Sequence, residues 1–291
     1  GADNTYACET MMSDGKALQA GTSHFLGQNF AKAFDIKFQN QNGDLEYAWT
    51  TSWGVSTRLI GAIIMTHSDD DGLIIPPRAA PVKAAILPIS TDEGKIASTL
   101  LPRAMELSSE LDRCLGGRFS FVDRQFYLRP GDRFFQHLQK GVPLRVELGE
   151  KDLAAGTARV VRRDTGEKMD IPLENLASRI PSLLEEIQSS LYDKALSFRR
   201  ENTAEVASYE EMKKVLEEKG GFVETWFAGS RDDEKKIKEE TGATARCMPI
   251  DSENPGTCFL IAVTISFLLV CTGWKKGTRS GAFFLESLSF Y

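Results

Sequence analysis

The residues that could do chemistry gather first between Lys16 and Gln28. Small residues there lie beside side chains that can donate and accept hydrogen bonds, namely Gln19, Thr22, Ser23, His24 and Gln28. Such a mixture lets the backbone approach a ligand while several polar groups converge on it. Taken alone, the stretch is better explained as the polar end of a strand with a structurally satisfied histidine.

A second stretch, residues 51–61, ends a segment rich in Ser, Thr and Gly with Arg58 and continues into an apolar run. This order predicts a strand followed by a helix near the arginine. A guanidinium there can grip a phosphate through two parallel hydrogen bonds, which the point charge of a lysine cannot do. A surface arginine that caps a turn is the alternative.

Asp69, Asp70 and Asp71 have the composition of a metal cluster. Three consecutive carboxylates on a regular strand point alternately to opposite sides, so they cannot all reach one ion. We therefore predict a solvated loop. The sequence offers no Ser-His-Asp or Cys-His set for nucleophilic catalysis.

Two regions with different residue patterns must position these residues. Residues 1–81 predict strands and tight loops, and three prolines (Pro76, Pro77 and Pro81) close the region. From residue 82 the pattern predicts a buried parallel strand at 82–89 and a helix at 94–113. Further strands are predicted at 118–122, 143–148 and 158–162, with a helix at 132–140 that Gly141 ends. This alternation indicates a compact α/β domain.

A third region begins with a long helix. Apolar residues from Ile180 to Phe198 recur on one face, with Pro181 expected in the first turn. Ser208 and Glu211 form the signature of a capping box before another helix, which Gly220 ends. A strand at 222–227 and a charged helix at 232–240 complete the prediction.

The charge is uneven along the chain. The 291 residues carry a formal net charge of −6, with 42% hydrophobic and 26% charged residues, as in an ordinary globular protein. Between Arg113 and Arg163, eleven Lys and Arg oppose five Asp and Glu, so this window is +6 and the remainder −12. A basic module on an acidic chain favours a polyanionic partner. Aromatic rings interleave with these arginines, as on surfaces that stack single-stranded RNA, and the alternative is that most are core residues.

The five cysteines are scattered, which argues against a disulfide framework and for a reducing compartment. The cytoplasm is therefore expected, or an organelle if a transit peptide has been lost. The longest apolar run, residues 259–270, is too short to span a bilayer, so no membrane partner is expected. Gly1 is not a start methionine, and the chain is expected to be a fragment of a longer protein.

Taken together, the two stretches resemble the prolyl-tRNA synthetases of the archaeal and eukaryotic type. That family carries a Gln-x-x-Thr-Ser-His-x-Leu-Gly-Gln element, matched from Gln19 to Gln28. Its version of class II motif 3, Trp-Gly-x-Ser/Thr-Thr-Arg, is matched from Trp53 to Arg58, and its Pro-Pro-x-x-Ala-Pro hinge from Pro76 to Pro81. The resemblance is nearly unbroken over residues 1–85 and looser beyond them.

The resemblance implies roles for individual residues. The proline pocket would be lined by Thr22, His24, Ser52, Trp53 and Gly54, with Glu9 just outside it. ATP would be held by Gln19, Ser56 and Arg58. The expected catalytic residues are His24 and Arg58. Of these, Arg58 would grip the terminal phosphate of a bent nucleotide. Anticodon bases would meet Glu147 and Arg162.

The implied reaction joins proline to ATP as prolyl-adenylate and then moves the prolyl group to tRNA(Pro), with Mg²⁺ helping to neutralise phosphate charge. The implied partners are proline, tRNA(Pro) and, in the full-length enzyme, a second copy of the chain. DNA is not expected. Motif 1, which builds the dimer interface, and motif 2, which contacts the α-phosphate, would lie upstream of Gly1.

The expected fold class is α/β, or α+β overall. Residues 1–81 would be the C-terminal part of a class II antiparallel-sheet catalytic domain. Residues 82–185 would form an α/β anticodon-binding domain with a mixed sheet, and residues 186–291 a small α+β domain.

The C-terminal region departs from the family in two ways. Some relatives hold zinc there with two pairs of cysteines, but the first pair falls on Ala228 and Asp233. Cys247 and Cys258 alone do not make a four-ligand site, so no zinc is expected. Residues 259–271 are either an extra buried strand or translated non-coding sequence, so the tail 259–291 is expected to be aberrant.

Two other functions stay open. A non-catalytic tRNA-binding or interaction fragment would use residues 82–185 alone and would bind tRNA without dependence on proline. An unrelated soluble α/β protein would require three ordered motifs to coincide.

Overall fold

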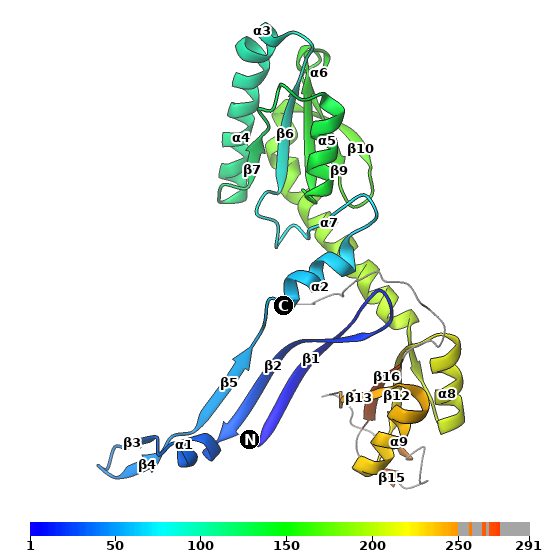
Figure 1. The fold of residues 1–291 in the computed structure, drawn as a ribbon. Helices are drawn as coiled ribbons and strands as arrows, with labels where there is room; N and C mark the ends of the chain where they lie inside the picture. The colour runs from blue at the N-terminus through cyan, green and yellow to red at the C-terminus, as the bar shows by residue number, and fades with distance from the viewer. Residues whose placement is uncertain (250–255, 258–263, 266–267, 274–291) are drawn as a thin grey trace. The chain divides into compact units, whose positions relative to one another are not determined.

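The computed structural model describes residues 1–249, 256–257, 264–265 and 268–273 (Figure 1). The chain forms two compact units. Unit 1 comprises residues 1–66 and 197–291, and unit 2 comprises residues 67–196. Among the described residues, none of the helices combines the length and the apolar character needed to cross a lipid bilayer.

An antiparallel three-stranded sheet forms the first part of unit 1. Its strands are β1 (Asn4–Met11), β2 (Ala17–Gly27) and β5 (Thr50–Gly54), in that order. Between β2 and β5 lie α1 (Asn29–Ala33) and a hairpin of β3 (Lys37–Gln39) and β4 (Leu45–Tyr47). After β5 comes α2 (Arg58–His67), so the predicted order of strand, arginine and helix is confirmed.

A four-stranded sheet forms the second part of unit 1. Its order is β11 (Thr203–Glu205), β12 (Gly221–Trp226), β16 (Leu268–Gly273) and β13 (Thr244–Cys247). Helices α8 (Tyr209–Glu218) and α9 (Arg231–Thr241) share a core with β12. Two short strands, β14 (Gly256–Thr257) and β15 (Thr264–Ile265), pair with each other. Part of residues 259–271, for which an extra buried strand and translated non-coding sequence were the two alternatives, lies in β16, and the remainder of that run lies largely outside the described residues.

The start of α8 confirms the predicted cap in part. The Ser208 hydroxyl accepts a hydrogen bond from the Glu211 amide at 3.2 Å. The Glu211 carboxylate accepts from the amide of Ala207 at 3.1 Å rather than from that of Ser208, because its long side chain reaches one residue farther back. Helix α8 ends before Gly220, whose φ of 74° favours glycine, as predicted.

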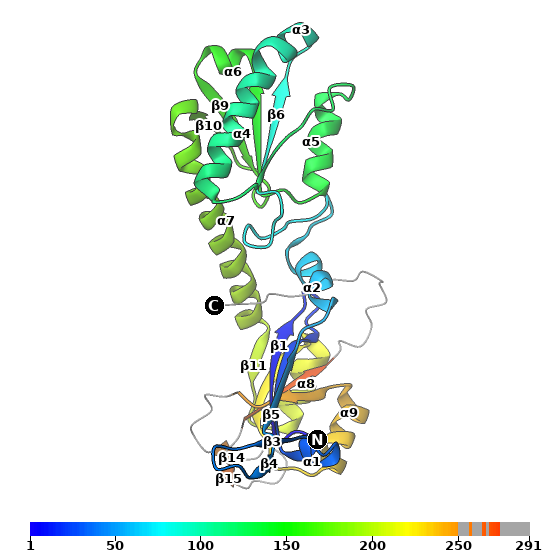
Figure 2. The same cartoon turned by 90° about the vertical axis from the view of Figure 1, so that its left-hand side faces the viewer.

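Unit 2 is built on a five-stranded mixed sheet of order β10-β9-β8-β6-β7. Strand β6 (Ala84–Ile89) is parallel to β7 (Ser120–Val122) and β8 (Leu144–Gly149), whereas β9 (Thr157–Arg162) and β10 (Lys168–Pro172) continue antiparallel. Helices α4 (Leu101–Leu115) and α7 (Leu173–Glu201) cover one face, and α5 (Pro130–Gln139) packs on the other (Figure 2). Shorter helical segments are α3 (Glu93–Lys95), a π-helical turn at Ile96–Leu100 and α6 (Glu150–Ala154). The predicted mixed sheet is confirmed, with β10 as an unpredicted fifth strand.

Pro181 does not lie in the first turn of its helix. Helix α7 begins at Leu173, directly after β10, and Pro181 lies inside it. Proline removes one backbone hydrogen bond, but the buried apolar face on both sides of it (Leu176, Ile180, Leu183, Leu184, Ile187 and Leu191) outweighs that loss. The helix continues through residue 186 to Glu201, so the domain boundary that we propose at residue 185 falls within it.

The loop predicted for Asp69–Asp71 is present, but Asp69 is not simply solvated. Its carboxylate accepts hydrogen bonds from Nη1 and Nη2 of Arg163 at 2.9 and 2.6 Å. These bonds hold the pKa of Asp69 below its usual range. The sequence could not reveal this pair, because the two residues lie 94 positions apart.

A buried ionic triad fastens α5 to the sheet of unit 2. Asp123 is fully buried, and its carboxylate accepts from Arg133 Nε at 3.1 Å and bonds His137 Nε2 at 2.7 Å. Arg133 also donates to the Pro88 carbonyl at 2.9 Å. Burial lowers the pKa of His137, so a neutral ring that donates from Nε2 accounts for this geometry.

We expect Asp123→Ala to lower the free energy of unfolding of unit 2 by about 3–5 kcal/mol, because Arg133 would stay buried without its anion. The four tryptophans of the sequence lie outside residues 67–196, so amide hydrogen exchange at Ile86 and Val146 is the suitable measurement. Asp132→Ala removes an exposed carboxylate of α5 and should cost less than about 1 kcal/mol. Equal exchange in the two variants would contradict the role of the triad.

A second prediction concerns His67, at the start of unit 2. Burial, helped by the positive charge of Lys194, lowers the pKa of His67 from 6.5 to about 4. Between these two pKa values, His67 therefore binds a proton in the unfolded chain but not in the folded unit. The free energy of unfolding is highest above pH 6.5, where His67 is neutral in both states, and it decreases as the pH falls towards 4. When the pH is lowered from 7 to 4.5, we expect the free energy of unfolding of unit 2 to fall by about 2 kcal/mol more in the wild type than in His67→Gln, as measured by the same exchange experiment. Parallel pH profiles for the two proteins would refute this.

Candidate functional site

A register shift between β1 and β2 decides which side chains share a face of the first sheet. Cys8 pairs with Gly21, whereas Glu9 pairs with Gln19, so Ala20 is an extra residue in β2. Side chains alternate along a strand, and one extra residue reverses the alternation beyond it. Gln19 is therefore turned to the face that carries Thr22 and His24. Without the shift, it would lie on the opposite face.

Strand β5 extends the same face. His24 pairs with Ser52 and Thr22 pairs with Gly54, so these positions lie side by side. We call the surface formed by Glu9, Gln19, Thr22, His24 and Ser52 the polar face. The register thus brings together most of the residues that the resemblance assigned to proline and ATP.

Trp53 is not brought to the polar face. It pairs with Ser23, whose side chain points the other way, and it is exposed. Phe25 lies on that second face and stacks on Trp49, with ring centroids 5.9 Å apart. Trp53 therefore belongs to an aromatic surface on the reverse of the sheet, together with exposed Tyr6.

His24 is oriented by a neighbour on β1. Its Nδ1 shares a hydrogen bond of 2.9 Å with the Thr5 hydroxyl, and the two residues are paired across the strands. The contact fixes the plane of the ring. It directs Nε2 away from Thr5.

Arg58 returns to the Gln19 end of the polar face. It is the first residue of α2, its amide donates to the Ser56 hydroxyl at 3.3 Å, and its Nη1 donates to the Gln19 carbonyl at 3.2 Å. This acceptor is a neutral carbonyl, and among the described residues Arg58 has no ion-pair partner within 4 Å. Gln19, Ser56 and Arg58, the three expected ATP residues, are therefore neighbours.

Glu9 lies opposite Gln19 and is half-buried. Burial raises its pKa, while the positive charge of Arg246, a hydrogen bond with the Gln19 side chain and the charge of Arg58 oppose that rise. Its Oε2 is buried and has no hydrogen-bond partner among the described residues. Arg246 is a neighbour that sequence reasoning missed, since no local pattern connects it to Glu9.

In unit 2, Glu147 and Arg162 lie on opposite faces of the sheet. Leu144 pairs with Arg162 and Glu147 pairs with Arg159, so Arg162 shares the face covered by α4 and α7. Glu147 shares the other face with Arg145, which donates to it at 2.9 Å. The two expected anticodon residues are therefore not brought together.

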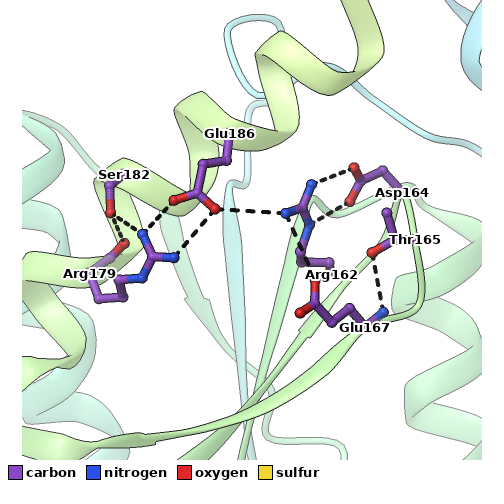
Figure 3. A network of polar contacts seen from close by, with 7 residues as sticks. All are labelled: Arg162, Asp164, Thr165, Glu167, Arg179, Ser182 and Glu186. Carbon is purple, nitrogen blue, oxygen red and sulfur yellow. Dashed lines mark hydrogen bonds and ion pairs between the residues drawn. The ribbon is translucent and has the colours of Figure 1, made fainter. Parts of the chain in front are cut away.

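Arg162 is held inside a network of carboxylates (Figure 3). Its Nε and Nη2 donate to the two oxygens of Asp164 at 3.0 and 2.8 Å, and Nη1 lies 3.8 Å from Glu186. On its far side, Glu186 also accepts from Arg179 (Figure 3). The Nε and Nη2 donors of Arg162 are thus already occupied.

A cleft of about 350 Å³ opens beside this network. It lies where the end of α5 meets β8, β9 and the turn 163–166, and its polar lining includes Asp71, Arg145, Arg162 and Lys168. Sequence reasoning missed Arg145 and Lys168. Strand alternation could have pointed to Arg145, which lies two residues before Glu147 on the same face.

Metal ligands do not gather among the described residues. No group of three or more His, Cys, Asp or Glu side chains there could hold an ion. Cys258 lies outside the described residues, so the expectation of no zinc stays a prediction.

Two family models match this chain. The model described as "Prolyl-tRNA synthetase, C-terminal" matches residues 209–264, and the one described as "Anticodon binding domain" matches residues 83–183. The second match coincides closely with the strands and helices of unit 2.

Curated relatives and a solved structure agree with these models. A proline–tRNA ligase of Flavobacterium johnsoniae is 50% identical over 259 residues, which are 89% of this chain and 52% of the relative. One of Roseiflexus castenholzii is 49% identical over 262 residues, covering 89% of this chain and 53% of the relative. The structure of Giardia lamblia prolyl-tRNA synthetase in complex with prolyl-adenylate matches with a TM-score of 0.85 and 29% identity, over 94% of this chain and 58% of that one. The chain thus spans about half the length of the curated relatives that it matches, and it belongs to the prolyl-tRNA synthetase family.

Proposed function

We propose that the protein carrying this chain is a proline–tRNA ligase, which activates proline with ATP and transfers it to tRNA(Pro). The observation that carries the proposal is the polar face, on which Glu9, Gln19, Thr22 and His24 meet Arg58. The names of the relatives, and the prolyl-adenylate in the Giardia structure, support the same chemistry. Because the chain spans about half of its relatives, the activity is proposed for the whole polypeptide.

The reaction has two steps and needs no nucleophile from the protein. A carboxylate oxygen of proline attacks the α-phosphorus of ATP, the bond to the β-phosphate breaks, and pyrophosphate leaves. A hydroxyl at the 3′ end of the tRNA then attacks the carbonyl carbon of prolyl-adenylate, and AMP leaves with the electron pair. Orientation and neutralisation of phosphate charge are what the protein must supply.

The polar face has an end suited to each substrate. Thr22, His24, Ser52 and Gly54 would surround proline, and Glu9 would accept from its protonated ring nitrogen. Gln19 and Ser56 would contact the nucleotide, and Arg58 would neutralise its terminal phosphate. Trp53 would reach proline only from the reverse of the sheet, so it is the weakest assignment.

Mg²⁺ would arrive with the nucleotide. The described residues offer no cluster of carboxylates for it, and Mg²⁺ commonly binds through substrate phosphates with one or two carboxylates. When bound, it would neutralise phosphate charge. Arg58 can act on the phosphate without it.

Unit 2 would bind the anticodon of tRNA(Pro). The face with Glu147, Arg145, Arg159 and Lys168 is the better candidate for bases, and Arg162 is assigned to the wall of the cleft. A homodimer and a cytoplasmic or organellar location, both expected above, stay predictions.

Arg58→Ala should reduce proline-dependent exchange between ATP and pyrophosphate by about 100-fold or more, because one preorganised charge at the phosphate is lost. The assay uses radiolabelled pyrophosphate with the whole polypeptide that carries this chain, in its wild-type and variant forms. Arg231→Ala, an exposed arginine at the start of α9, is the matched control and should keep full activity.

A second outcome of this assay distinguishes the rival function. A wild-type chain that binds tRNA but gives no exchange at any proline concentration would be a non-catalytic tRNA-binding fragment. If the wild type gives exchange and Arg58→Ala gives the same exchange, the proposed role of Arg58 is wrong, but the proposal of a proline–tRNA ligase stands.

For the anticodon, Glu147→Ala should reduce discrimination between the cognate anticodon and single-base variants by about 5–100-fold, with little loss of overall affinity. Lys168→Ala should instead weaken binding to every sequence and lower the slope of log affinity against log salt by about 0.7–0.9. The measurement is filter binding of tRNA transcripts at several salt concentrations.

Arg162→Ala provides the contrast. Arg162 bonds Asp164 and lies near Glu186. The main effect of the variant should therefore be a lower free energy of unfolding of unit 2, with a smaller effect on the discrimination between anticodons. A stable Arg162→Ala protein that loses discrimination would reverse the two assignments.

A further inference from the structure

The polar face ends against the C-terminal part of unit 1. Met11 and Ala17, paired next to the turn of the β1–β2 hairpin, form one buried cluster with Phe222 of β12, joined by half-buried Phe198 and Cys247. The hairpin turn is equally close, since a Cβ on Gly15 would lie 3.2 Å from the amide nitrogen of Gly221. One end of the candidate site is therefore fixed by residues about 200 positions later in the chain.

Arg246, on β13, reaches across this junction. Its Nη2 donates to the carbonyl of Ala17 at 3.2 Å. Ala17 lies two residues before Gln19, and Gln19 faces Glu9 across the strands. Among the described residues, Arg246 has no ion-pair partner within 4 Å, so its charge acts on the nearest carboxylate without forming a direct pair with it.

We propose that Arg246 is a positioning residue for the site around Glu9: it anchors the end of β2 and keeps a positive charge beside the Glu9 carboxylate. The inference rests on the proposed function only where it assigns Glu9 to the proline nitrogen. The charge of Arg246 opposes the effect of burial on the Glu9 pKa, with smaller help from Gln19 and Arg58. Cys247 is another titratable neighbour, a thiol whose pKa is raised by burial and by the charge of Glu9.

The geometry explains why a distant arginine is useful here. Glu9 must be charged to accept from a protonated amine. Its Oε2, however, is buried and has no hydrogen-bond partner in the part of the chain that the structure describes, a condition that favours the neutral acid. A cation bonded to Glu9 itself would compete with the substrate for the carboxylate. A cation held on a backbone carbonyl nearby favours the charged form and leaves the oxygens open.

The test compares Arg246→Met, Arg246→Lys and the control Arg231→Met in the full 291-residue chain. Amide hydrogen exchange is followed at residues 9–11 and 17–19, and the Glu9 pKa is measured from the carbon-13 shift of its carboxyl group. Arg246→Met should speed exchange about tenfold, because a charged donor is lost, and should raise the Glu9 pKa. Arg246→Lys should restore the pKa but not the exchange, and Arg231→Met should change neither.

Exchange at Val223, in the core of the C-terminal part, verifies that the variants remain folded. If Val223 stays protected while Arg246→Met leaves both the exchange and the Glu9 pKa unchanged, the proposal is wrong. If Arg246→Met unfolds that part, the comparison of Arg246→Lys with wild type decides, and an unchanged exchange in Arg246→Lys overturns the anchoring role.

The proposed function is tested separately, with a non-hydrolysable sulfamoyl analogue of prolyl-adenylate. If the wild-type chain binds the analogue, Arg246→Met should weaken binding about tenfold, and the Lys variant should recover part of it. A wild-type chain that does not bind the analogue counts against the proposed function in this chain, while the exchange and pKa results still judge Arg246.

Discussion

The one-residue register shift between β1 and β2 is the constraint on which the candidate site depends. A side chain on a strand points to one face of the sheet or to the other. Without the extra Ala20, the side chain of Gln19 would therefore point to the aromatic side of the sheet. Ala20 itself is buried, which favours a small residue at the point where the two strands come out of step. The same shift turns Ala17 towards the side on which Met11 meets the C-terminal part.

The arginines of the two units are held in different ways, and the difference separates structural from functional charge. In unit 2, Arg133, Arg145, Arg159, Arg162 and Arg163 each bond a carboxylate. Three of these partners (Asp170, Asp164 and Asp69) lie outside the basic window, so its charge of +6 overstates what RNA would meet. In unit 1, Arg58 and Arg246 both bond carbonyls of β2, which fixes their position and leaves their charge available.

Local sequence patterns predicted the elements well because those elements are decided locally. The helix predicted at 94–113 is present as α3, the π-helical turn and α4, which together run from Glu93 to Leu115, and a strand precedes Arg58 as predicted. Pro181 was misplaced because its cost is small beside the burial of the α7 face. The contacts of Glu147 and Arg162 were beyond reach, because whether they share a face depends on how β8 and β9 align, which neither strand encodes alone.

The same reasoning explains why motif residues were easier to find than the residue that supports them. Gln19, Thr22 and His24 lie within six positions, so their pattern is visible in the sequence. Arg246 acts through a carbonyl 229 positions away, and a backbone acceptor places no demand on the side chain of its residue. No pairing of residue types connects the two positions. The polar face is therefore a property of the whole of unit 1, since its chemical groups come from the first strands and its geometry also depends on β13.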